Sequence, residues 1–279
     1  MSNIKILVCC HKDDLKLSSE VYFPLHVGKA ISTLDLGIQG DNTGDNISSK
    51  NPNYCELTGL YWAWKNLQNI DYIGLCHYRR YFDFNGYGKK GFPTVPLKSS
   101  CFSKVNFDIN SKIISYLERG YVITAKETSL TMPLYYSYCG FHNYQELKYA
   151  LDYLNSIDPQ KYSKVINEHV VQGNRIKFYN MFIMSWKEFD KYCSWLFPIL
   201  EHMEGLIDIS NYDTYHKRAF GFIGEYLFNV YIWAEKLKVK QVPVLKFDDS
   251  EEEKLPCSNM LLYKFRCLRN ALAMKLLRY

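Results

Sequence analysis

The segment His77-Tyr78-Arg79-Arg80 places two arginines side by side among aromatic residues. Two guanidinium groups offer forked hydrogen-bond donors that match the oxygens of a diphosphate and balance its charge without a metal ion. Surface charge is the simpler interpretation, but the flanking Tyr78 and Tyr81 are unusual around residues that only keep a protein soluble. Arg79 and Arg80 are therefore candidates for a diphosphate site.

Glu225 lies in an otherwise apolar stretch, residues 220–228, near the expected start of a helix. Burial raises the pKa of a carboxyl group and suits it to proton abstraction, whereas a helix N-terminus favours the charged form. The sequence favours Glu225 as a general base. A helix cap, or a salt bridge with Arg218, is the structural alternative.

Other polar candidates lie in expected loops. Residues 37–53 are rich in Gly, Asp, Asn and Ser, which favour turns. Within them, Asp41, Asp45 and Asn46 could accept hydrogen bonds from ribose or sugar hydroxyls, or bind a divalent cation; a turn without a ligand fits equally well. His142 could orient a substrate or carry a proton, with a purely structural histidine as the alternative.

Short apolar runs that end in these polar clusters predict the strands of an α/β sheet. The runs 4–10 and 71–77 deliver His11 and the two arginines at strand ends, where open α/β sheets bind ligands. Residues 84–104 predict a loop. Further strands are expected over 121–125, 178–184 and 239–245, the last as an edge strand that tolerates its proline, and helices over 54–67, 144–154, 160–171, 186–203 and 221–236. Strands and helices alternate without a break in composition, which predicts one α/β domain over residues 1–250.

The segment 251–279 predicts a basic amphipathic helix. Leu262, Phe265, Leu268, Leu272 and Leu276 share one helical face, and residues 262–279 contain five basic residues and no acidic one. Such a helix can lie on an anionic membrane surface. An ordinary terminal helix packed on the body of the protein fits as well.

Composition narrows the function classes. The 34 basic and 29 acidic residues give a net charge of +5, too mild for duplex DNA binding, and no nucleic-acid-binding motif is present. The nine scattered cysteines predict reduced thiols. Without a signal peptide or a long apolar run, the chain is expected to be cytoplasmic. Common nucleotide-triphosphate, dinucleotide, serine-hydrolase and zinc-protease motifs are missing.

Five ordered motifs together resemble a bacterial family labelled as a domain of unknown function and found in capsular and exopolysaccharide gene clusters. Its members resemble nucleotide-sugar glycosyltransferases, including galactofuranosyltransferases. The resemblance extends from about residue 4 to residue 245. The motifs are Gly40–Ser48, Asn53–Asn66, His77–Phe82, Asn180–Met184 and Arg218–Glu225.

The resemblance implies a glycosyltransferase A-type, Rossmann-like fold. In such a fold the first strand and its loop, here Cys10 and His11, hold the uridine, with Asp45 and Asn46 nearby. A later strand end holds the diphosphate, and most such enzymes carry an Asp-x-Asp metal site there. This chain has His77-Tyr78-Arg79 instead, so we expect a clamp from Arg79 and Arg80 without metal, while Mn²⁺ or Mg²⁺ stays an alternative.

The resemblance also implies a mechanism. Glu225 would deprotonate an acceptor hydroxyl that attacks the anomeric carbon of a UDP-hexose with inversion, and Asp213 is the reserve base. The remaining sugar or acceptor contacts are assigned to Glu56, Tyr61, His142, Asn180, Trp186 and Arg218. Galactofuranose is the first choice of sugar, for capsule, exopolysaccharide or O-antigen synthesis. A lipid-linked acceptor would give the C-terminal helix a role at the inner face of the plasma membrane.

Other functions stay open at this stage. The donor could be UDP-galactopyranose or another UDP-hexose. A glycoside hydrolase would need two carboxylates, which Glu225 and Asp213 could supply, but it would leave the arginines unexplained. A non-catalytic sugar-binding protein of a polysaccharide complex could use the aromatic residues, 16% of the chain, as stacking surfaces.

Overall fold

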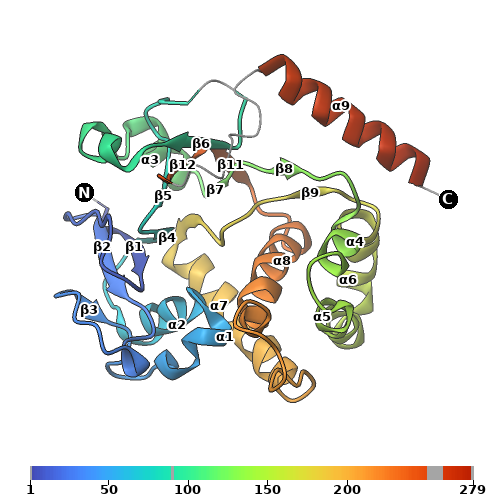
Figure 1. Ribbon diagram of the computed structural model, residues 1–279, viewed down its shortest axis with the longest axis horizontal. Coiled ribbons are helices and arrows are strands. Elements are labelled where there is room, and N and C mark those ends of the chain that lie inside the picture. The colour runs from blue at the N-terminus through green and yellow to red at the C-terminus, as the bar shows by residue number, and fades with distance from the viewer. Residues whose placement is uncertain (1, 89–90, 250–259, 278–279) are drawn as a thin grey trace.

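The computed structural model describes residues 2–88, 91–249 and 260–277 (Figure 1). Its centre is a sheet in which seven strands follow the order β11-β7-β10-β4-β1-β2-β3. All of these run parallel except β10, which lies antiparallel between β4 and β7. The strands are β1 Ile4–Cys10, β2 Tyr22–His26, β3 Gln39–Gly40, β4 Tyr72–His77, β7 Val122–Ala125, β10 Phe182–Ser185 and β11 Val239–Val242.

Three further strands extend the sheet from the end of β4. They are β5 Arg80–Phe82, β6 Thr94–Leu97 and β12 Val244–Phe247, with β12 paired to both of the others. The single edge strand predicted over 239–245 is therefore wrong. Pro243 has no N–H for the ladder and separates β11 from β12. The segment 84–104 is likewise not only a loop, because it contains β6.

Helices cover the sheet on both faces. The helices are α1 Asn51–Tyr54, α2 Leu57–Asn66, α3 Ser111–Glu118, α4 Leu134–Cys139, α5 Tyr144–Ile157, α6 Pro159–Val165, α7 Trp186–Glu204, α8 Ala219–Ala234 and α9 Met260–Leu277. A π-helical turn, Ile166–Val171, continues α6, and a two-stranded sheet joins β8 Thr128–Ser129 to β9 Arg175–Ile176. In Figure 1, α4, α5 and α6 lie beside α8, on the side of the molecule away from β1–β3.

The alternation of side chains along β1 divides the apolar interior in two. Leu7 and Cys9 face the larger core, which contains residues of α2, α7 and α8, whereas Val8 and Cys10 face the smaller core, which contains residues of α3, β5 and β12. Successive side chains of a strand point to opposite faces. Only one of the two cysteines at the end of β1 can therefore face the same side as α8.

Two predicted elements are interrupted by residues in left-handed backbone conformations. Cys55, at φ +52°, separates α1 from α2 within the predicted helix 54–67. Tyr179 and Asn180, at φ +80° and +51°, delay the predicted strand 178–184 until Phe182. Such angles are costly for residues with a side chain, and they gather where function constrains the backbone.

The C-terminal helix forms over Met260–Leu277. Asn270 faces the body of the protein, where its side chain donates to the Ser129 carbonyl over 3.1 Å. Phe265, Leu268 and Leu272 are more than half exposed. No helix within the described part of the chain is both long and apolar enough to span a bilayer. The predicted domain boundary at 250/251 lies outside the described residues.

Candidate active site

A cavity of about 650 Å³ opens where β1 and β4 end and β10 begins. The α1–α2 junction and the first turns of α8 line its other sides. Its lining contains two carboxylates and five basic or histidine side chains. These are Glu56, Glu225, His11, His77, Arg80 and Arg218, with Lys217 next to Arg218.

Two arginines in this cavity have no carboxylate partner among the described residues. The guanidinium of Arg80 lies 4.8 Å from the centre of the Tyr179 ring, and that of Arg218 lies over Phe222 and donates to the Cys55 sulfur over 3.2 Å. By contrast, Arg79 forms an ion pair with Asp14 at 2.7 Å. The turn from β4 into β5 sends the two neighbouring arginines to different surroundings, so Arg80 lines the cavity with Arg218 and Lys217, whereas Arg79 is paired outside it.

Glu225 lies beyond the first turn of α8, which begins at Ala219, two residues before the predicted start. Its Oε1 accepts a hydrogen bond from the Tyr179 backbone N–H. Burial raises the pKa of Glu225 to about 7, against the lowering effect of that hydrogen bond and of Arg80 and Arg218; Glu56 raises it further. A carboxyl group with this pKa exchanges its proton readily at neutral pH.

The strained pair Tyr179–Asn180 joins both carboxylates to β4. Nε2 of His77 lies 2.7 Å from the Tyr179 carbonyl oxygen and therefore donates to it. The Asn180 side chain donates to Glu56 over 2.7 Å. Burial lowers the pKa of His77, so the imidazole is neutral at pH 7 and its Nε2 carries the proton. One irregular turn thus fixes the positions of His77, Glu56 and Glu225.

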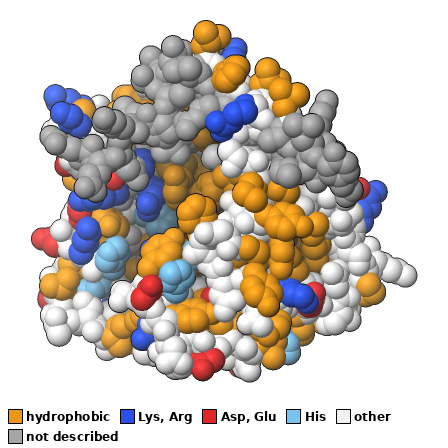
Figure 2. All heavy atoms as spheres, turned by 45° about the vertical axis from the view of Figure 1, so that its right-hand side comes forward, with side chains coloured by type: hydrophobic (Ala, Val, Ile, Leu, Met, Phe, Trp, Pro, Cys, Tyr) orange, Lys and Arg blue, Asp and Glu red, His pale blue; other side chains and the backbone are white. Residues whose placement is uncertain are grey.

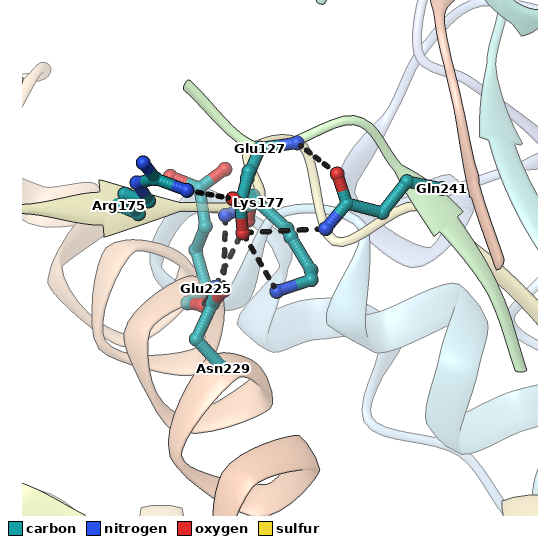
Figure 3. Close-up of polar contacts among 6 residues, drawn as sticks. All are labelled: Glu127, Arg175, Lys177, Glu225, Asn229 and Gln241. Atoms are coloured by element: carbon teal, nitrogen blue, oxygen red, sulfur yellow. Dashed lines mark hydrogen bonds and ion pairs between the residues drawn. The ribbon is translucent and has the colours of Figure 1, made fainter. Parts of the chain in front are cut away.

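A second network holds the segment that leads into this turn (Figure 3). Asn229, one helical turn beyond Glu225, accepts from the Lys177 N–H and donates to the Lys177 carbonyl, both over 2.9 Å. It also donates to the Glu225 carbonyl. On the other side, Glu127 binds Arg175 at 3.0 Å and the buried Lys177 at 3.7 Å. The backbone before Tyr179 is therefore clamped to α8, which keeps the Tyr179 N–H on Glu225.

Comparison with known proteins places the chain in a family. A family described as "Domain of unknown function (DUF4422)" matches residues 5–236. The chain belongs to this family. A solved structure entitled "WbbM bifunctional glycosytransferase apo structure" matches with a TM-score of 0.78 and 32% identity over 89% of this chain. The DUF4422 chain spans only 46% of that protein. Among curated proteins, no significant match was found.

The fold of this DUF4422 member is therefore that of part of a glycosyltransferase: a mixed α/β domain with a central sheet, as the sequence predicts. The two arginines of the expected Arg79–Arg80 clamp lie in different surroundings: Arg80 lines the cavity, whereas Arg79 pairs with Asp14. Arg218, assigned from the sequence to the sugar site, lies in the cavity with Arg80. Six predicted site residues line one cavity: His11, Glu56, His77, Arg80, Arg218 and Glu225.

Several predicted site residues lie elsewhere. Cys10 is buried in the smaller core, and its neighbour Cys9 lines the cavity instead. Asp45 accepts from the Tyr61 hydroxyl over 3.1 Å, and Asn46 caps its own turn through Ser48.

Trp186 begins α7, after the far end of β10, where its backbone N–H donates to the Asp71 carbonyl. Asp213 binds His216 on an exposed loop. His142 packs on Phe222, at the edge of the cavity lining, and Asn180 reaches the cavity through Glu56.

The carboxylate of Asp41 is already occupied by donors of the protein. Asp41 is fully buried and accepts from the backbone N–H groups of Gly28 and Lys29 and from the Ser48 and Thr58 hydroxyls. These donors occupy both carboxylate oxygens. The described residues contain no group of three His, Cys, Asp or Glu side chains arranged to hold a metal ion.

The lining residues that sequence reasoning missed include Cys9, Cys55, Tyr179, Lys217 and Phe222. The parity of β1 could have identified Cys9, because the side chains before it with the same parity face the α8 side. No sequence signal marks Cys55 or Tyr179. Their left-handed backbone conformations bring them to the cavity, and these depend on tertiary contacts.

Proposed function

We propose that this DUF4422 member is a glycosyltransferase that moves a hexose from a UDP-sugar to a hydroxyl of a saccharide acceptor, with inversion at the anomeric carbon. One observation carries the proposal. Two guanidinium groups without carboxylate partners, Arg80 and Arg218, line the same cavity as Glu225, whose pKa is about 7. A leaving diphosphate needs the positive charge of the two arginines, and an attacking hydroxyl needs a base such as Glu225.

Arg80 and Arg218 hold the diphosphate in this proposal. Charge develops on the phosphate oxygen of UDP as the glycosidic bond breaks, and donors already aimed at that position stabilise it. Neither arginine must leave a carboxylate partner to make this contact. The cavity cations supply the neutralisation that a divalent metal supplies elsewhere, so we propose that transfer proceeds without a bound metal.

Glu225 accepts the proton of the acceptor hydroxyl. The hydroxyl oxygen forms the new bond to the anomeric carbon, the bond from that carbon to UDP breaks, and its electron pair stays on the diphosphate. The two arginines lower the pKa of Glu225 in the free enzyme. Diphosphate binding screens their charge, so the bound donor makes Glu225 a stronger base.

Glu56 is proposed to hold a hydroxyl of the donor sugar. Its Oε1 accepts from Asn180, which fixes the orientation of the carboxylate and leaves the second oxygen for a ligand. In this arrangement Asn180 is a positioning residue. The five sequence motifs support galactofuranose as the transferred sugar, with other UDP-hexoses as the alternative, and a role in capsule, exopolysaccharide or O-antigen synthesis.

The acceptor is proposed to be lipid-linked, with α9 on the membrane surface from the cytoplasmic side. The exposed side chains of Phe265, Leu268 and Leu272, together with the basic residues Lys264 and Arg269, support this part of the proposal. An apolar face with adjacent basic groups suits an anionic lipid surface.

Turnover with defined donors tests the proposal. Purified protein receives UDP-galactofuranose, UDP-galactopyranose or UDP-glucose with a galactoside acceptor, in manganese or in EDTA, and UDP release and product mass are measured. We expect transfer that depends on the acceptor and persists in EDTA. The Glu225→Gln variant should bind UDP as the wild type does and lose turnover. Sugar binding without turnover would instead support a non-catalytic protein, and acceptor-independent hydrolysis would support a glycosidase.

A further inference from the structure

Three aromatic rings contact one another beside the cavity, and we call them the aromatic shelf: Tyr215, His142 and Phe222. The Tyr215 and His142 rings are nearly parallel, with centroids 5.8 Å apart and an interplanar angle of 13°. His142 packs on Phe222 at 4.3 Å, and Phe222 lines the cavity. The shelf therefore runs without interruption from the cavity to the surface.

The outer end of the shelf is open. Tyr215 is 49% exposed, and Phe141, next to His142 in the chain, is 70% exposed. Figure 2 shows histidine and basic side chains together with hydrophobic ones on one face of the molecule. Large aromatic side chains exposed beside a cavity indicate a binding surface rather than an unfinished core.

The shelf combines ring faces with a free polar group. Nδ1 of His142 is buried without a hydrogen-bond partner among the described residues. Burial, His216 and Arg218 lower the pKa of His142 to about 4, so at neutral pH the imidazole has one donor and one acceptor. A sugar ring has apolar C–H faces and hydroxyl groups at its edge. Aromatic faces with an amphipathic neighbour match both of these features.

His216 fixes the shelf between two loops. Its Nδ1 lies 2.9 Å from Asp213 Oδ2, and its Nε2 lies 3.2 Å from the Phe141 carbonyl oxygen. Both partners are acceptors, and the hydrogen bond to Asp213 raises the pKa of His216, which favours the form that donates from both nitrogens. Tyr215 is thereby held against the α4–α5 connection, and a ligand that stacks on it meets a surface already in place.

We propose that the aromatic shelf is the acceptor subsite: a neutral hexose of the acceptor stacks on Tyr215, and its reacting hydroxyl extends past Phe222 towards Glu225. This inference rests on the proposed function, since it assigns the acceptor side of the same cavity. The arginines occupy the donor side. A peptide partner would not require a surface that leads into the cavity of Glu225.

The test separates acceptor binding from donor binding. For Tyr215→Ala we expect the KM for a galactoside acceptor to rise about tenfold, as expected for the loss of one stacked ring, with an unchanged Kd for UDP. Tyr215→Phe should retain the wild-type KM. Tyr136→Ala, which removes a similarly exposed ring whose ring contact is Tyr135 on α4, is the matched control and should also retain it.

A binding measurement distinguishes the failure of this inference from that of the proposed function. Saturation-transfer NMR with methyl β-galactopyranoside in the presence of UDP needs no turnover. If the alanine variant does not fold, Tyr215→Leu removes the ring but keeps a larger apolar side chain than alanine. Galactoside binding that Tyr215→Leu abolishes supports the shelf even if no product forms. If the Tyr215→Ala and Tyr215→Leu variants fold, remain active and keep the wild-type acceptor KM, the acceptor subsite is wrong but the proposed function stands. A change confined to the Kd for UDP would lead to the same conclusion.

Discussion

Replacing Glu225 by glutamine should stabilise the protein while abolishing turnover. The carboxyl group is held among apolar residues of α8 and opens on one side to the cavity. Glutamine has nearly the same shape, and its Oε1 can still accept the hydrogen bond from the Tyr179 N–H. The substitution therefore removes a buried negative charge and leaves the packing in place.

The size of the effect follows from the pKa of Glu225. This pKa rises from an ordinary 4.5 to about 7 on folding, and each pKa unit corresponds to about 1.36 kcal/mol, so the charged form costs about 3 kcal/mol. Between these two pKa values the folded state binds more protons than the unfolded state. Stability is therefore lost as the pH rises from about 4.5 to about 7. Solvent in the cavity screens part of this cost, which leaves about 2 kcal/mol.

Denaturant unfolding at pH 5 and pH 8 measures the effect. The free energy of unfolding of Glu225→Gln should exceed that of the wild type by about 2 kcal/mol more at pH 8 than at pH 5. Glu201→Gln, at an exposed position on α7, is the matched control and should show no such pH dependence. A difference that is the same at both pH values would refute the reasoning, because the carboxyl group would then carry no folding penalty.

Three further predictions concern the same cavity. Arg80→Ala and Arg218→Ala should each weaken UDP binding by about 10- to 100-fold in calorimetry, which corresponds to the loss of one charged hydrogen bond. Arg79→Ala should have less effect. An equal loss of affinity in all three variants would contradict the assignment of the diphosphate to Arg80 and Arg218. The value of kcat/KM should fall below pH about 7, where Glu225 is protonated. The acid limb of the kcat profile should lie at higher pH, because bound diphosphate screens the charge of the arginines. Acid limbs at the same pH in both profiles would argue against this coupling. Asn229→Ala should move the acid limb upward by releasing the Tyr179 N–H from Glu225, whereas a lower kcat with an unmoved limb would indicate a purely structural role.

The regular elements were largely predictable from the sequence. Apolar periodicity placed β1, β4, α5, α7 and α8 close to their observed bounds, because burial on one face fixes both the period and the position of such elements. The prediction failed where single residues override the pattern. Pro243 divides one apolar run into two strands, and Cys55 interrupts a run that is amphipathic on both sides.

The composition of the cavity was predictable only in part. Residues at strand ends, such as His11 and His77, could be inferred because parallel strands end at one edge of a sheet. The partner of each charged side chain could not be inferred from the sequence. Asp14 and Arg79 are 65 positions apart, and only the fold brings them to 2.7 Å. Asp41 was likewise ambiguous, because its four donors come from three separate segments.

The most direct test of the central claim is the structure of the protein with UDP bound. The account predicts the diphosphate within hydrogen-bond distance of both Arg80 and Arg218, with Glu225 facing the position of the anomeric carbon. A diphosphate bound at Arg79, or at the loop that contains Asp45, would contradict it.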